Sequence, residues 1–130
     1  MLRSILIVSF GGALGSLLRY ATGVWFSRFI QSPFPYATFT VNVAGCFLIG
    51  FLYAVLELYN CFSSEWRLLF IPGFCGGLTT FSAFAFENIK LLQQGNSLLF
   101  ILYSVGSFAI GLLAVLAGMN SIKLLSLSAK

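Results

Sequence analysis

The segment of this chain with the most chemical potential is residues 73–87, whose sequence is GFCGGLTTFSAFAFE. Glycine, threonine, serine and glutamate stand here inside an apolar stretch, where backbone groups must be hydrogen-bonded within protein or line a polar cavity. We expect Pro72 and the glycines after it to break a helix, and Thr79 or Thr80 to cap a second half-helix. Amino ends of half-helices attract anions and unwound carbonyls coordinate cations, so the segment predicts an ion site.

Two phenylalanines follow the expected break. Phe81 and Phe84 lie three residues apart and are therefore neighbours on a helix surface, and Thr80, Phe84 and Glu87 form a second close row. The edge of a phenylalanine ring is electropositive and can contact an anion. Lipid-facing or core phenylalanine is far commoner, and in a chain with 15 Phe the spacing alone does not separate the two roles.

Polar residues also interrupt two other apolar stretches. Asn42 carries an amide that both donates and accepts, so it must join helices or lie beside a polar path. Tyr103, Ser107 and Gly111 recur every four residues and form one helical stripe. Hydroxyl groups in a row could pass an ion along, and they could equally be packing residues bonded to their own backbone.

Arg19 is the one charge well inside the first apolar stretch. An arginine there costs at least about 2.5 kcal/mol on insertion scales unless it is paired or hydrated. It either extends to the membrane surface or loop carbonyls from near the end of a helix, or draws anions to a vestibule. Gly11 and Gly15 precede it at four-residue intervals and predict close packing, within the chain or between two chains.

The composition indicates a membrane protein. Hydrophobic residues make up 59% of the 130 residues, charged residues 8%, and the mean hydropathy is +0.99, whereas about a quarter of a soluble domain is charged. Apolar runs of about 20 residues are long enough to cross a bilayer as helices. We therefore predict an all-α membrane protein with one four-helix transmembrane domain, residues 1–130, whose spans are roughly 4–29, 37–58, 66–92 and 97–119 and whose third helix is broken.

Several functions are excluded by what the sequence contains. Histidine is absent and the three cysteines are widely spaced, which leaves no zinc or transition-metal motif and no Ser-His-Asp set, so no enzyme is expected. The net charge of +4 comes from dispersed basic residues and gives no reason to expect nucleic acid as a partner. No A-x-A cleavage site follows the first apolar run. With the amino terminus inside, Arg3, Arg67, Lys123 and Lys130 would be cytoplasmic and Arg28 and Lys90 outside. This bias is small, so membrane orientation is weakly specified.

Three elements together resemble the Fluc-type (CrcB-like) fluoride channel family: GGALGSLLRY from Gly11, TVNVAG around Asn42, and GFCGGLTTFSAF from Gly73. The resemblance covers the whole chain, and its third motif is highly specific. It implies an antiparallel, dual-topology homodimer in the cell inner membrane that exports fluoride. Such a dimer has two pores and a central structural sodium ion, Na+.

The resemblance also implies roles for individual residues. It assigns the fluoride pore to Phe81, Phe84, Asn42, Ser82, Thr80, Tyr103, Ser107 and Glu87. Arg19 would line the vestibule, and the backbone carbonyls of Gly76 and Thr79 would bind sodium, since carbonyl oxygen suits a hard cation. Ala83 and Gly111 depart from the family pattern, which usually has threonine and serine there, so two hydroxyl groups of the path are missing.

Two other kinds of protein compete with this interpretation. A small multidrug-type proton-coupled transporter also has four spans, but it needs a titratable carboxylate in the first span, and this span has none. A non-conducting membrane assembly would not need Asn42, Thr79, Thr80 or Glu87 at membrane depth. Whether the partner in a dimer is an identical chain or a paralogue stays open.

Overall fold

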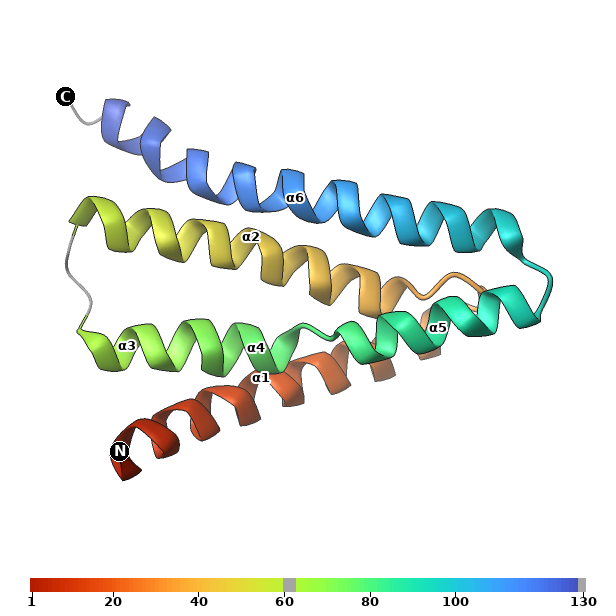
Figure 1. The fold of residues 1–130 in the computed structure, drawn as a ribbon, viewed down its shortest axis with the longest axis horizontal. Coiled ribbons are helices and arrows are strands. Elements are labelled where there is room, and N and C mark those ends of the chain that lie inside the picture. The colour runs from red at the N-terminus through yellow and green to blue at the C-terminus, as the bar shows by residue number, and fades with distance from the viewer. Residues whose placement is uncertain (60–62, 129–130) are drawn as a thin grey trace.

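The computed structural model of the protein describes residues 1–59 and 63–128, which are helical apart from short connections (Figure 1). The long helices are α1 (Leu2–Phe29), α2 (Tyr36–Tyr59) and α6 (Ser97–Ser128). Between α2 and α6 lie α3 (Ser64–Leu68), the π-helix η1 (Leu69–Cys75), α4 (Gly76–Leu78) and α5 (Phe81–Gln93). The stretches long and apolar enough to cross a membrane are Leu2–Phe29, Tyr36–Glu57, Ser64–Gln93 and Ser97–Ile122, so the four predicted spans are confirmed.

The third span is broken, but not where the sequence suggested. Pro72 lies inside η1, and the helical stretch runs through it and the following glycines to Leu78. Proline lacks the N–H that a helix needs, and the wider π-helical turn accommodates that loss without ending the helix. The prediction that Pro72 and its glycines break the span is therefore wrong, because the interruption comes later, at Thr79 and Thr80.

The helices pack as two close pairs, and in the first pair glycines of α1 allow the close approach. α1 lies against η1 and α4, and α2 lies against α6. A Cβ atom on Gly11 would collide with the Leu69 carbonyl oxygen, and one on Gly15 would collide with that of Phe74. Both glycines therefore serve packing within the chain, which decides between the two alternatives that their spacing left open.

The amino terminus and the end of α6 lie on the same side of the molecule (Figure 1). Gly95, between α5 and α6, has φ of +76°, a conformation that glycine adopts without strain. In Figure 1 the amino terminus and the visible end of α6 lie at the same end of the molecule, as an even number of spans requires. At that end Arg3 of α1 forms an ion pair with Glu65 of α3, with 2.8 Å between nitrogen and oxygen.

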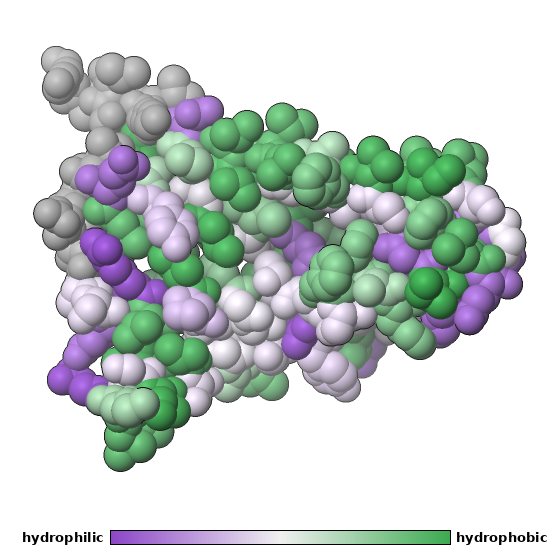
Figure 2. All heavy atoms as spheres, in the orientation of Figure 1, coloured by the Kyte–Doolittle hydropathy of each residue, from purple (hydrophilic) through white to green (hydrophobic). Residues whose placement is uncertain are grey.

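The outer faces of the helices are strongly apolar. Figure 2 shows hydrophobic residues along much of the visible surface, with hydrophilic residues mostly toward the two ends and a few in the middle. Large side chains such as Phe10, Leu17, Phe108 and Leu113 are more than half exposed. A surface of this kind fits a lipid environment, and with the four apolar helices it indicates a multi-pass membrane protein.

Candidate functional site

The helix break consists of two extended residues between α4 and α5. Thr79 has φ −82° and ψ 154°, and Thr80 has φ −150° and ψ 119°. The Thr80 hydroxyl oxygen accepts a hydrogen bond from the Ala83 N–H at 3.2 Å and so caps α5. The Thr79 hydroxyl instead donates to the Cys75 carbonyl at 2.9 Å. The prediction that one of the two threonines begins a second half-helix is confirmed for Thr80.

Asn42 of α2 holds this break by two hydrogen bonds. Its Oδ1 accepts from the Thr80 N–H at 2.8 Å, and its Nδ2 donates to the Thr80 carbonyl at 3.1 Å. Nearby on α2, a Cβ atom on Gly45 would collide with the Thr79 side chain. The close approach of α2 therefore brings a polar side chain against a backbone that the third span leaves without helical partners.

A cavity of about 330 Å³ opens beside the break, and we call it the break cavity. It is lined by Asn42, Cys46, Ile49, Thr79, Thr80, Phe81, Phe84, Ser107 and Phe108. Five of the eight residues predicted for the pore line it: Asn42, Thr80, Phe81, Phe84 and Ser107. The structure thus brings together residues from α2, the broken span and α6 that are up to 66 positions apart.

The two phenylalanines form a continuous aromatic row. The ring centroids of Phe81 and Phe84 are 5.8 Å apart, and Phe84 lies 4.9 Å from the Tyr103 ring with an interplanar angle of 57°. Phe84 is half-buried, whereas 80% of Phe81 is exposed on the single chain. The row therefore leads from the interior of the chain to its surface.

Glu87 is held by two hydroxyl groups. Thr38 donates to its Oε1 at 2.6 Å, and Tyr103 donates to its Oε2 at 2.7 Å. The Tyr103 side chain is fully buried and Thr38 is buried. Both carboxylate oxygens therefore have a donor, which lowers the cost of keeping this group inside an apolar span.

The predicted polar stripe on α6 is divided between two environments. Tyr103 bonds Glu87, while Ser107 lines the break cavity with a buried Oγ that has no hydrogen-bond partner among the described residues. Gly111 faces α2, and a Cβ atom there would lie 3.5 Å from the Cys46 Sγ, an ordinary contact distance. Because Gly111 has no side chain, the space that a serine would occupy there is empty and lies next to the Cys46 thiol.

The remaining predicted residues lie near the break or away from it. The Ser82 hydroxyl is 3.2 Å from that of Thr80 and is exposed. Gly76, in α4, is exposed on the single chain. Arg19 is half-buried on α1, and within the described residues it has no ion pair and does not line the break cavity.

Sequence reasoning missed three polar residues that support the site. Thr38 lies four residues before Asn42, and this spacing was a signal that could have placed it on the same face of α2. Asn88 is buried, donates to the Phe84 carbonyl at 2.9 Å and accepts from the Ser104 hydroxyl at 2.7 Å. The Asn88–Ser104 hydrogen bond joins α5 to α6 next to Phe84, and no pattern in the local sequence predicts this contact.

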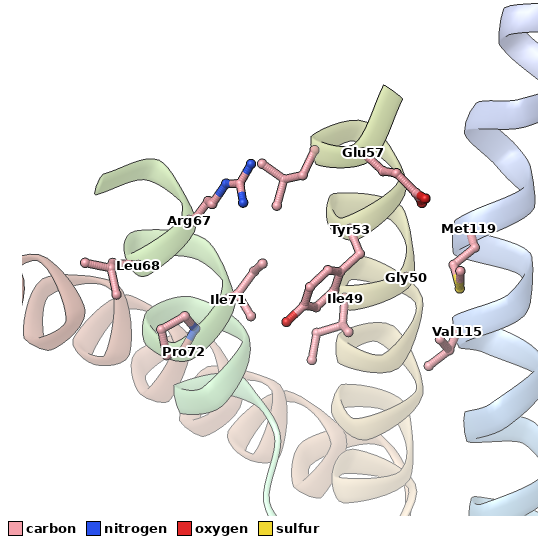
Figure 3. A pocket seen from close by; sticks show the side chains of 11 residues that line it. Ile49, Gly50, Tyr53, Glu57, Arg67, Leu68, Ile71, Pro72, Val115 and Met119 are labelled. Carbon is pink, nitrogen blue, oxygen red and sulfur yellow. The ribbon is translucent and has the colours of Figure 1, made fainter. Parts of the chain in front are cut away.

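A larger cavity, of about 720 Å³, lies between α2, the first half of the third span and α6. Figure 3 shows Arg67 extending toward α2 while Glu57 points toward α6, and the two form no ion pair. None of the predicted site residues lines this cavity.

Within residues 1–59 and 63–128 there is no cluster of three or more His, Cys, Asp or Glu that could hold a metal ion. The third cysteine, Cys61, lies outside the described residues.

Known proteins resemble this chain over nearly its whole length. Residues 6–119 match the family described as CrcB-like protein, Camphor Resistance (CrcB). A relative from Flavobacterium psychrophilum is 45% identical over 118 residues, which cover 91% of this chain and 95% of the relative. One from Acidobacterium capsulatum is 46% identical, covering 86% and 90% of the two chains, and one from Rhizobium johnstonii is 43% identical, covering 97% and 100%. All three are named fluoride-specific ion channel FluC.

The family match and the geometry concern the same part of the molecule. The matched range includes Asn42, the Thr79–Thr80 break and the aromatic row of Phe81 and Phe84. The match spans most of the chain, and the relatives share more than two fifths of their residues with it. The chain therefore belongs to the CrcB family.

Proposed function

We propose that this protein is a fluoride-selective ion channel, and not an enzyme, that lets fluoride leave the cytoplasm across the cell inner membrane. The observation that carries the proposal is the break cavity, where an aromatic row, an amide and an unpartnered hydroxyl meet beside a helix break at membrane depth. The relatives named as fluoride-specific channels supply the identity of the ion.

The chemistry of these groups suits a small, strongly hydrated anion. A narrow path must replace the water of fluoride with hydrogen-bond donors and ring edges, while leaving no room for a larger ion. Ser107 has a hydroxyl that no other described group binds, and Phe84 and Phe81, 5.8 Å apart, would present their ring edges to the ion one after the other. Fluoride would pass along these groups, with Thr80, Ser82, Asn42, Tyr103 and Glu87 bordering its path and Arg19 drawing anions to the vestibule.

Two chains in antiparallel orientation would complete the pore. Phe81 is 80% exposed on the single chain, and an aromatic ring that lines a pore must be covered by protein on its other side. The weak division of basic charge allows each chain to insert in either sense. The functional unit would then be a dual-topology homodimer with two pores, one for each aromatic row.

A structural sodium ion would lie between the two breaks, bound by the carbonyl oxygens of Gly76 and Thr79 of both chains. Carbonyl oxygen is a suitable ligand for a hard cation. Gly76 is exposed on the single chain, as a group at a two-fold axis between chains would be. The ion would coordinate carbonyl oxygens that the break leaves without a helical donor.

Fluoride efflux from liposomes tests the proposal. Purified protein should release fluoride from loaded vesicles and retain chloride under the same gradient. Release of both ions at similar rates, or of neither, would contradict it. A small multidrug-type transporter should instead couple transport to protons, and α1 carries no carboxylate that could do so.

A further inference from the structure

The geometry of the break points to Asn42 as the residue that creates the cation site, and so we propose that it is a positioning residue for the sodium ion as well as a neighbour of the pore. The inference rests on the proposed function, because that function supplies the sodium ion. It adds a physical connection between the pore side chain and the backbone that would hold the ion.

The backbone N–H of Thr80 bonds a side chain instead of a helical carbonyl. In a continuous α-helix the Thr80 N–H would bond the Gly76 carbonyl, four residues earlier. Here that N–H donates to Asn42 Oδ1 at 2.8 Å, so the Gly76 carbonyl has lost its helical donor. Thr80 is extended, and its N–H and carbonyl therefore face the same side, as in a hydrogen-bonded strand pair. One carboxamide can bridge both groups.

The backbone N–H of Ala83 also bonds a side chain instead of a helical carbonyl. In a continuous helix the Ala83 N–H would bond the Thr79 carbonyl. The Thr80 hydroxyl takes this N–H at 3.2 Å, so the Thr79 carbonyl has also lost its helical donor. The two carbonyls released in this way, at Gly76 and Thr79, are the two that the sodium proposal requires.

The carbonyl oxygens of Gly76 and Thr79 are left without a helical hydrogen-bond donor. A backbone carbonyl without a partner inside an apolar span is unfavourable, and a cation that it coordinates removes this cost. Asn42 and Thr80 therefore do by side-chain hydrogen bonding what proline was expected to do at position 72. Without the hydrogen bond from the Thr80 N–H to Asn42, that N–H could bond the Gly76 carbonyl, and the cation would lose this carbonyl as a ligand.

Two substitutions at Asn42 separate this role from a role in the pore. Asn42→Asp keeps an oxygen that accepts from Thr80 N–H, but it places a carboxylate beside the anion path. Asn42→Leu removes the acceptor altogether. We expect Asn42→Asp to lower fluoride flux while sodium binding persists, and Asn42→Leu to weaken sodium binding at least about tenfold, which corresponds to about 1.4 kcal/mol.

The measurement is the rise in thermal midpoint of purified protein as sodium chloride replaces choline chloride at constant ionic strength. Ser107→Ala is the matched control, because Ser107 lines the break cavity without a hydrogen bond to the break backbone, and it should keep the sodium response. A second pair tests the Thr80 step independently. Thr80→Ser retains the cap and should bind sodium normally, whereas Thr80→Val should weaken binding as Asn42→Leu does.

Equal sodium responses in wild type, Asn42→Leu and Thr80→Val would overturn the inference, as would an equal loss in Asn42→Asp and Asn42→Leu. If Asn42→Leu does not fold, the Thr80 pair and Asn42→Asp decide the matter. A wild-type protein that conducts fluoride but shows no sodium response would also overturn it while leaving the channel proposal intact. A protein that responds to sodium but conducts no fluoride would contradict the channel proposal alone.

Discussion

At the scale of single residues, the site depends on side chains that satisfy buried polar groups on other elements. Asn42 bonds both backbone groups of Thr80, and Thr38 and Tyr103 each bond one oxygen of Glu87. Each of these contacts joins different elements, and those of Asn42 and Thr38 span 38 and 49 positions of the sequence. Removing one partner should therefore cost more than the loss of a single exposed hydrogen bond.

Tyr103→Phe tests the hydroxyl that holds Glu87. The ring would still pack against Phe84, but Glu87 Oε2 would lose its donor inside the span, so the free energy of unfolding should fall by about 1 to 3 kcal/mol. Unfolding in detergent by increasing dodecyl sulfate measures this loss. Tyr20→Phe, at an exposed tyrosine of α1, is the matched control and should change little. Wild-type stability of Tyr103→Phe would show that the hydroxyl does not hold the carboxylate.

At the scale of the elements, the sequence predicted the spans well because each is a run of about 20 apolar residues. It misplaced the break because proline and glycine are local signals, whereas the cause of the break is not local. Thr80 is held out of the helix by Asn42, 38 residues earlier. The roles of Thr38 and of the Asn88–Ser104 pair were missed for the same reason, since their partners lie on other helices.

The same scale explains the glycines of α1. Their four-residue spacing predicted close packing, but the sequence did not identify the partner, because a helix face formed by glycines can pack closely against any other helix. The structure pairs Gly11 and Gly15 with the backbone of η1 and α4. These contacts fix the first half of the third span, and with it the position from which the break begins.

Gly15→Ala tests this contact. The added Cβ would collide with the Phe74 carbonyl and lie 2.7 Å from the Leu78 nitrogen, so the helices would have to separate, and unfolding free energy should fall by about 1 to 3 kcal/mol. Gly23→Ala is the control on the same helix. Nothing lies within 4 Å of its added Cβ, and alanine favours a helix, so it should be neutral or stabilising by up to about 1 kcal/mol. Equal effects of the two changes would show that α1 does not rely on Gly15 for packing.

At the scale of the whole molecule, a single chain leaves the proposed path open on one side. Phe81 is exposed, and so are other apolar side chains of α5 and α6, among them Phe108, which lines the break cavity with it. Membrane lipid could cover these groups, but it could not complete a path for an anion. The proposed antiparallel partner would cover the exposed end of the aromatic row.

Dual insertion makes a direct prediction about a tag at the carboxyl end. A tag placed there should be labelled from both faces of the membrane in cells, because the basic residues give only a small bias toward one orientation. Three lysines added after Lys130 should bias insertion to one sense and reduce fluoride flux. A wild-type tag that is labelled from one face only would exclude the antiparallel dimer.

The central claim is that fluoride passes along the aromatic row beside the break, and the most direct measurement is fluoride efflux from liposomes holding Phe84→Ile or Phe86→Ile. Phe84 lines the break cavity, whereas Phe86 on the same helix is 63% exposed and lies outside it. Both swaps keep most of the side-chain volume and should leave the dimer intact by size-exclusion chromatography. We predict a steep fall in flux for Phe84→Ile and near wild-type flux for Phe86→Ile. Wild-type flux in Phe84→Ile and in Phe81→Ile would contradict the account, because the row would then be packing alone.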